Sequence, residues 1–190
     1  HLMRIVPASF ACAAAVLFTA CAAPAASATD WWSETNAEYR FELNLPQSYG
    51  HTFLRDVKRQ MSALRRTYEA YVPPQRPVGV GIVRIFATKD AFDAHLREAN
   101  CGLSPGLFVG VWNPNAGELD LLSLDRKNRE TLQSMRHEAF HQYLFYATGR
   151  GDHAMWFNEG HACLFESVHF DAAGNRVKVN DEGARAAWVA

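Results

Sequence analysis

The chain has 190 residues, 48% of them hydrophobic, which is enough for one domain with a sizeable core. Its formal net charge is −1, and no cluster of basic residues creates a positive field, so the composition argues against nucleic acid as a partner. No internal repeat is visible, and no low-complexity tract follows the N-terminal segment.

Residues 1–28 have the pattern of an export signal. Arg4 supplies an early positive charge, and an apolar stretch from Phe10 to Ala20 follows it. Ala26-Ser27-Ala28 fits the A-x-A cleavage pattern, whereas the apolar stretch is too short for a comfortable transmembrane helix. We therefore expect an exported protein whose single domain covers residues 29–190.

The same segment carries a leading dipeptide and a candidate lipidation site. His1-Leu2 precede Met3 and have the look of a leading scar or a mis-set start. Phe18-Thr19-Ala20-Cys21 resembles a bacterial lipobox, although Leu is the usual residue where Phe18 stands. A lipid on Cys21 would be the link to a membrane. Both alternatives place the domain outside the cytoplasm, in the periplasm, in the medium or anchored at the envelope.

The first half of the domain predicts strand, helix, strand and helix. Apolar residues alternate from Phe41 to Leu45, as in a short strand, and recur at helical spacing from Tyr49 to Ala70. Pro73-Pro74 ends that helix. Val78–Ala87 is apolar on both faces, as in an interior strand, and Lys89–Glu98 is typical of a short amphipathic helix.

The second half predicts a hairpin, two helices and a last hairpin. Leu107–Trp112 and Glu118–Leu124 are strand-like segments on either side of a turn-rich sequence. Thr131–Ala147 has the periodicity of a helix, and a second helix should run from Met155 to Ser167. The last hairpin should turn at Asp171–Gly174.

Residues 137–141 read His-Glu-Ala-Phe-His, an HExxH motif inside the first of these two helices. Positions i and i+4 share one face of a helix, so His137 and His141 can point at one metal ion, and Glu138 beside them can activate water. Catalytic zinc takes three protein ligands and keeps one open position. Glu159, in the sequence Trp-Phe-Asn-Glu-Gly at 156–160, is the candidate third ligand.

Three neighbours of Glu159 compete for the role of third ligand. His153 lies in a glycine-rich turn of unknown reach, and Cys163 is a good soft zinc ligand when deprotonated. His161 is two residues from Glu159 and therefore faces away from it on a helix. Glu159 remains the preferred ligand. We expect surface or capping positions for the other histidines of the domain, which are His51, His95 and His169.

The segments RHEAFHQYLF (136–145) and WFNEGHACLFE (156–166) resemble the gluzincin metallopeptidases, most closely the peptidase-MA-like group of secreted bacterial proteins. The resemblance covers about residues 38–170. It implies a zincin-like α+β fold with a mixed sheet packed on helices. It also implies Zn²⁺ as cofactor, with His137, His141 and Glu159 as ligands and Glu138 as general base.

The same resemblance implies where a substrate would lie. In zincins the penultimate strand before the metal-binding helix forms the edge of the sheet, and here that strand is 107–112. An exposed edge offers unpaired N–H and C=O groups to an extended peptide. Gly110, Val111 and Trp112 are therefore the candidate residues of a substrate-binding edge.

The sequence departs from the gluzincin pattern at Cys163. Gluzincins usually carry an acidic residue four positions after the ligand Glu, where it holds a zinc-bound His by its second ring nitrogen. A thiol is a weak acceptor, so Glu166, one turn further along the helix, is the obvious substitute. Cys163 can alternatively pair with Cys101 in a compartment that permits disulfides, or be a buried thiol.

The donor that would stabilise an oxyanion is not evident. Gluzincins often supply a Tyr or His after the ligand helix, and after Glu166 this sequence offers only His169. Either His169 or an upstream tyrosine, Tyr143 or Tyr146, serves, or the natural protein continues beyond Ala190.

The predicted function is that of a zinc peptidase acting on a peptide or protein. The alternative is a catalytically silent zinc-binding domain that recognises peptides or cell-envelope material, which the cysteine at position 163 and the missing oxyanion donor favour. A third hypothesis is hydrolysis of a non-peptide amide, such as a cell-wall cross-link.

Overall fold

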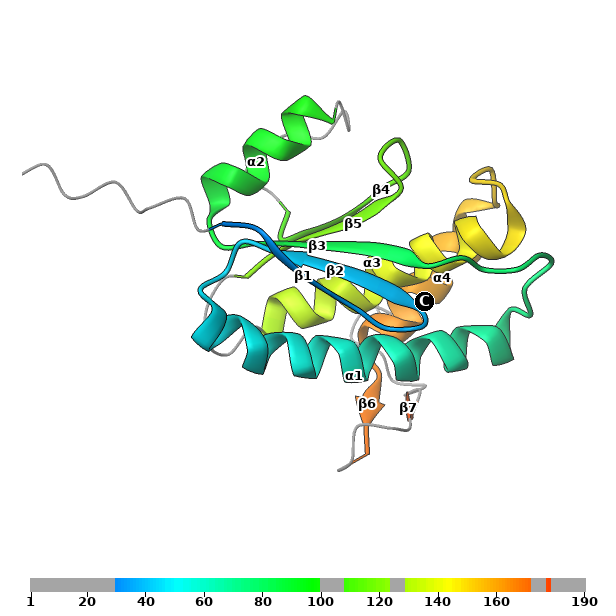
Figure 1. The fold of residues 1–190 in the computed structure, drawn as a ribbon. Coiled ribbons are helices and arrows are strands. Elements are labelled where there is room, and N and C mark those ends of the chain that lie inside the picture. Colours follow the sequence, from blue (N-terminus) through cyan, green and yellow to red (C-terminus); the bar gives the residue numbers. More distant parts are fainter. Residues whose placement is uncertain (1–29, 100–107, 124–128, 172–176, 179–190) are drawn as a thin grey trace, which may run out of the picture.

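The computed structural model describes residues 30–99, 108–123, 129–171 and 177–178. They form an α+β arrangement in which a five-stranded mixed sheet is packed between helices (Figure 1). The strands of this sheet are β1 (Trp32–Thr35), β2 (Tyr39–Leu43), β3 (Gly81–Phe86), β4 (Gly110–Asn113) and β5 (Glu118–Leu122). The helices are α1 (Gln47–Tyr71), α2 (Lys89–Glu98), α3 (Arg129–Thr148) and α4 (Met155–Glu166).

The order of the strands in the sheet is β1-β2-β3-β5-β4. The inner strands β2, β3 and β5 run parallel to one another, whereas β1 and β4 pair antiparallel at the two edges. The prediction that the first strand of the central hairpin lies at a sheet edge is therefore confirmed for β4. The prediction placed this strand at 107–112, whereas β4 begins at Gly110 and ends at Asn113. Residue 107 lies outside the described residues.

Helices α1 and α3 cover one face of the sheet, α2 covers the other, and α4 packs on α3 (Figure 1). The main core lies between the sheet and α1 and α3, with Phe41, Tyr68 and Phe140 among its fully buried side chains. The buried face of α3 carries Met135, Ala139, Phe140, Tyr143, Leu144 and Ala147. Because this face points into the core, the polar residues of the HExxH motif lie on the remaining surface of the helix.

A second, smaller core joins α2 to the opposite face of the sheet. Its buried side chains are Phe86, Phe92, Leu96, Val111 and Leu122. Thr88 caps the helix by accepting a hydrogen bond from the backbone N–H of Ala91. The bounds of α2 are those that the sequence predicted.

The remaining differences from prediction have local causes. Within the predicted strand 78–87, strand β3 begins at Gly81 and ends at Phe86. It begins at Gly81 because its partner β2 begins only at Tyr39, opposite Gly81. Strand β1 was not predicted. Strands β6 (His169–Phe170) and β7 (Val177–Lys178) pair antiparallel, as the last predicted hairpin requires, although its turn at 172–176 lies outside the described residues.

The expected export signal and the lipobox cysteine, Cys21, also lie outside the described residues. Among the helices that are described, none is long and apolar enough to cross a membrane.

Candidate metal centre

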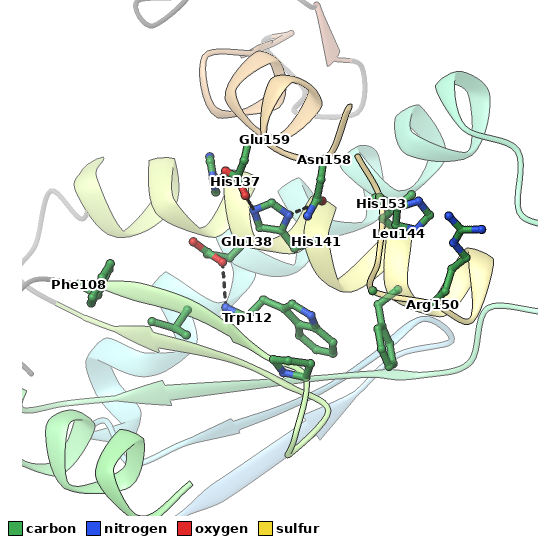
Figure 2. Close-up of a pocket in the computed structure, with 14 residues that line it drawn as sticks. Phe108, Trp112, His137, Glu138, His141, Leu144, Arg150, His153, Asn158 and Glu159 are labelled. Carbon is green, nitrogen blue, oxygen red and sulfur yellow. Dashed lines mark hydrogen bonds and ion pairs between the residues drawn. The ribbon is translucent and has the colours of Figure 1, made fainter. Parts of the chain in front are cut away.

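Helices α3 and α4 bring His137, His141 and Glu159 together in the lining of one cavity, between Phe108 on one side and Arg150 on the other (Figure 2). The Nε2 atom of His137 lies 3.4 Å from Oε2 of Glu159, and the Nε2 atom of His141 lies 3.6 Å from Oε1 of the same carboxylate. The two imidazole rings are 4.9 Å apart, centroid to centroid. Both rings are largely buried, whereas the Glu159 side chain is 50% exposed, so the group has one side open to solvent.

Each imidazole has an oxygen of α4 next to its other ring nitrogen, through a hydrogen bond at His141 and an ion-pair contact at His137. Nδ1 of His141 lies 2.8 Å from Oδ1 of Asn158, and Nδ1 of His137 lies 3.3 Å from Oε2 of Glu166. Gln133 in turn donates from Nε2 to Oε1 of Glu166 at 2.8 Å. An oxygen at Nδ1 favours the tautomer that keeps Nε2 unprotonated, and here both Nε2 atoms face Glu159.

The contacts at Glu159 can be compared with the spacing of ligands around one zinc ion, although His137 and His141 meet different oxygens of its carboxylate. Ligand atoms of His137, Glu138 and His141 also lie within 4.8 Å of one another. Ligand atoms bound to tetrahedral zinc at about 2.0–2.1 Å are about 3.3–3.4 Å apart. The two nitrogen-to-oxygen distances at Glu159, 3.4 and 3.6 Å, are close to that value. Two imidazoles and a carboxylate are also a donor set that zinc accepts in catalytic sites, where a fourth position stays open.

Glu138 lies beside the ligands and is held by the sheet. Its Oε2 atom accepts a hydrogen bond of 2.9 Å from the backbone N–H of Trp112 in β4 (Figure 2). Burial raises the pKa of the Glu138 carboxyl; His141 and the Trp112 N–H oppose this rise, and the charges of Glu159 and Glu166 add to it. A carboxylate with a raised pKa is a better proton acceptor near neutral pH than an ordinary glutamate.

The cavity in front of these residues has a volume of about 500 Å³. One wall is apolar and contains Trp112 and Phe145, whose rings are 5.6 Å apart, together with Leu144. Arg150 and His153 border the cavity beyond His141 (Figure 2). A metal centre next to a half-apolar cavity can bind an organic substrate and hold it against the activated water.

The predicted substrate edge, Gly110, Val111 and Trp112, borders this region. Val111 and Trp112 line the cavity, and Gly110 lines an adjoining one shared with His137 and Glu138. The N–H of Trp112 is already bonded to Glu138, so it is not available to a substrate while that bond persists. A Cβ on Gly110 would stand 2.6 Å from Oγ of Ser134 in α3, so a larger residue at this position would require the Ser134 side chain to move.

The other candidate ligands lie differently. His153 lines the cavity, but its Nε2 atom is 2.9 Å from Oγ1 of Thr148. His161 Nδ1 lies 2.8 Å from the carbonyl oxygen of Phe157 in its own helix, and its ring stacks on Phe140. Cys163 offers a sulfur within 4.8 Å of ligand atoms of His137 and Glu166. The alternatives of a disulfide with Cys101 and a buried thiol both stay open, because Cys101 lies outside the described residues.

The predicted oxyanion donors are not among the described residues that line the cavity. Tyr143 donates its hydroxyl to the carbonyl oxygen of Val72 at 2.6 Å, and Tyr146 donates to that of Gly117 at 3.1 Å. His169 is exposed on β6, as expected for a surface residue. Apart from the candidate ligands and Glu138, the charged and polar side chains that line the cavity include those of Arg150, His153 and Asn158.

Sequence reasoning missed one residue of the site and misplaced one histidine. Asn158 stands directly before Glu159 in the Trp-Phe-Asn-Glu-Gly segment, and its contact with His141 depends on how α4 packs on α3. His95 was expected at the surface. That expectation was wrong, because its side chain is 18% exposed and lies 3.3 Å from Asp120, which is completely buried.

Comparisons of this protein with protein-family models, with curated proteins and with solved structures found no match. The assignment of a function therefore depends on the chemistry of the site and on the motif.

Proposed function

We propose that the protein is a zinc-dependent hydrolase and that its substrate is a peptide or protein. One observation carries this proposal: two imidazoles, each with an oxygen of α4 next to Nδ1, direct Nε2 toward the carboxylate of Glu159. Glu138 is half-buried next to them and lines the same cavity. This combination is what hydrolysis by a metal-activated water requires.

The residues would divide the work as follows. His137, His141 and Glu159 would hold the zinc ion, while Asn158 and Glu166 keep the two rings in place. A bound zinc ion supplies Lewis acidity and lowers the pKa of water toward about 7. Glu138 would take a proton from the attacking water and pass it to the leaving amine. Its hydrogen bond from Trp112 fixes the carboxylate in one orientation.

The cavity supports a peptide as the substrate. Trp112 and Phe145 offer an apolar surface for one side chain, and β4 is a sheet edge at which an extended main chain can pair. The resemblance of the HEAFH and WFNEG segments to gluzincin peptidases points to the same substrate class. The expected third ligand and general base of that family are Glu159 and Glu138, which the fold brings to one cavity.

A second candidate function is a catalytically silent zinc-binding domain that recognises peptides or cell-envelope material. The observation in its favour is that Tyr143 and Tyr146 are bonded to backbone carbonyls, away from the cavity lining. Without a donor for the oxyanion, hydrolysis loses one of its largest contributions to rate.

Digestion of an unfolded protein separates the two functions. Casein should be cleaved by the zinc-loaded protein, not by the protein stripped with a chelator, and cleavage should return when zinc is restored. Glu138→Gln should abolish cleavage. The control is Glu38→Gln, in the turn between β1 and β2 at the edge of the sheet opposite β4, and it should leave cleavage unchanged. A wild-type protein that binds zinc and cleaves nothing would support the silent domain instead.

A further inference from the structure

A second group of metal-binding side chains lies on the opposite face of the sheet. Side chains alternate along strand β5. Leu119 and Leu121 belong to the main core, and Glu118 and Asp120 therefore point to the other face, toward α2. His95 of α2 meets the two carboxylates: its Nε2 atom lies 3.3 Å from Oδ2 of Asp120 and 3.5 Å from Oε2 of Glu118. One ligand atom from each residue lies within 4.8 Å of the others.

Four buried polar atoms of this group have no hydrogen-bond partner among the described residues. Asp120 has no exposed surface, and neither of its carboxylate oxygens has a hydrogen-bond partner among the described residues. Oε2 of Glu118 and Nε2 of His95 also have no hydrogen-bond partner among the described residues. An ionised carboxylate taken out of water without a partner costs several kcal/mol, so buried carboxylates are paired or coordinate a metal.

The neighbouring cation does not compensate this charge. Arg84 binds Oε2 of Glu42 at 2.8 Å and Oε1 of Glu118 at 3.1 Å, so it satisfies one oxygen of Glu118 and leaves Asp120 untouched. A protonated His95 could offer a single Nε2–H to the three remaining carboxylate oxygens. A divalent cation at the same place would coordinate the nitrogen and both carboxylates at once.

We infer that the protein binds a second divalent transition-metal ion, held by His95, Glu118 and Asp120 between α2 and β5. The contact distances of 3.3 and 3.5 Å resemble those at the first centre and suit donors that share one ion at about 2.0–2.2 Å. One imidazole and two carboxylates are hard to borderline donors, which suits zinc and its first-row neighbours.

The role of this ion would be structural. Asp120 is fully buried, and none of His95, Glu118 and Asp120 lines the cavity of the first centre. Helix α2 lies on the opposite face of the sheet from α3 (Figure 1). Among the described residues, the core beneath α2 contains five buried side chains, far fewer than the main core. An ion that links His95 to β5 would fasten α2 in the way that structural metals stabilise small cores.

Metal stoichiometry tests this inference. The full chain is stripped with a chelator, saturated with Zn²⁺ alone, freed of excess metal and analysed for zinc per chain. The wild type should hold two zinc ions, and Asp120→Asn, which keeps the size of the side chain, should hold one. The matched control is Asp90→Asn, an exposed aspartate in the first turn of the same helix, which should still hold two.

The two centres are separated by emptying the first. A chain with both His137→Ala and His141→Ala should retain one zinc ion, and zinc should raise its midpoint of thermal unfolding. Adding Asp120→Asn to that chain should remove both the ion and the rise in the midpoint. If the wild type saturates at one zinc ion and the chain without His137 and His141 binds none, the inference is overturned, and a protonated His95 is what pairs with Asp120. These two proteins decide the question even if Asp120→Asn fails to fold.

Discussion

Glu166 is the residue by which the packing of α4 on α3 would control the metal centre. Its Oε2 atom lies 3.3 Å from Nδ1 of His137, and Gln133 donates to its other oxygen at 2.8 Å. Glutamine at this position has one oxygen for two donors. If that oxygen accepts from His137, the NH₂ group of the new glutamine faces the NH₂ group of Gln133. In the reverse orientation, the NH₂ group of the new glutamine faces the imidazole of His137.

Glu166→Gln should therefore weaken zinc binding without emptying the centre. Residues that orient a metal-bound imidazole are typically worth 10–100-fold in affinity, or about 1.4–2.7 kcal/mol. We expect about 10-fold for Gln, which keeps the volume, and closer to 100-fold for Ala, which also leaves a cavity at a residue only 6% exposed.

Competition with a chromophoric zinc chelator measures this affinity directly. Circular dichroism shows whether each variant is folded, and Cys163→Ala is the control that distinguishes the two candidate orienting residues. It should change the zinc affinity much less than Glu166→Gln does. The reasoning is refuted if Glu166→Gln binds zinc within about twofold of the wild type. A larger loss for Cys163→Ala would mean that the thiol, and not Glu166, supports His137.

Three further predictions concern the base, the third ligand and the core. Glu138→Gln should keep its zinc and lose about 10²–10⁴-fold in the rate of casein cleavage, and a rate close to that of the wild type would rule out Glu138 as the base. Glu159→Ala should lose zinc in elemental analysis while its circular dichroism is unchanged, because the side chain is half exposed; undiminished zinc affinity would show that another residue is the third ligand. Phe140→Ala, at a fully buried position, should lower the free energy of unfolding in urea by about 3–5 kcal/mol, and a loss below 1 kcal/mol would contradict the packing described for α3.

The helices and the motif were predictable because their signals are local. The predicted span Thr131–Ala147 differs from α3 by two residues at one end and one at the other, and the span of α2 agrees at both ends. The shared face of His137 and His141 follows from the helical repeat alone. The sequence also indicated that Glu166 would replace the acidic residue missing at position 163, and its side chain does lie next to His137.

Contacts between elements were harder to predict because they depend on how distant segments pair. Strand β1 has four residues and alternates a half-buried with an exposed side chain, so its pattern is weak until β2 lies beside it. His95 was placed at the surface because helical periodicity says which residues share a face and not what that face meets. The carboxylate of Asp120 comes from a strand that is 25 residues away along the chain.

The α3–α4 pair links the chemistry of the site to the stability of the fold. Phe140, the residue directly before His141, packs on Phe165 of α4 with the two ring centroids 5.2 Å apart. On α4, Asn158 and Glu166 are eight residues apart and so lie on one face, from which each reaches an imidazole of α3. Any shift of α4 along α3 would therefore displace Glu159 and both orienting oxygens together. On the proposed function, zinc binding should stabilise this helix pair, and loosening the aromatic contact should weaken zinc affinity even though neither ring touches the ion.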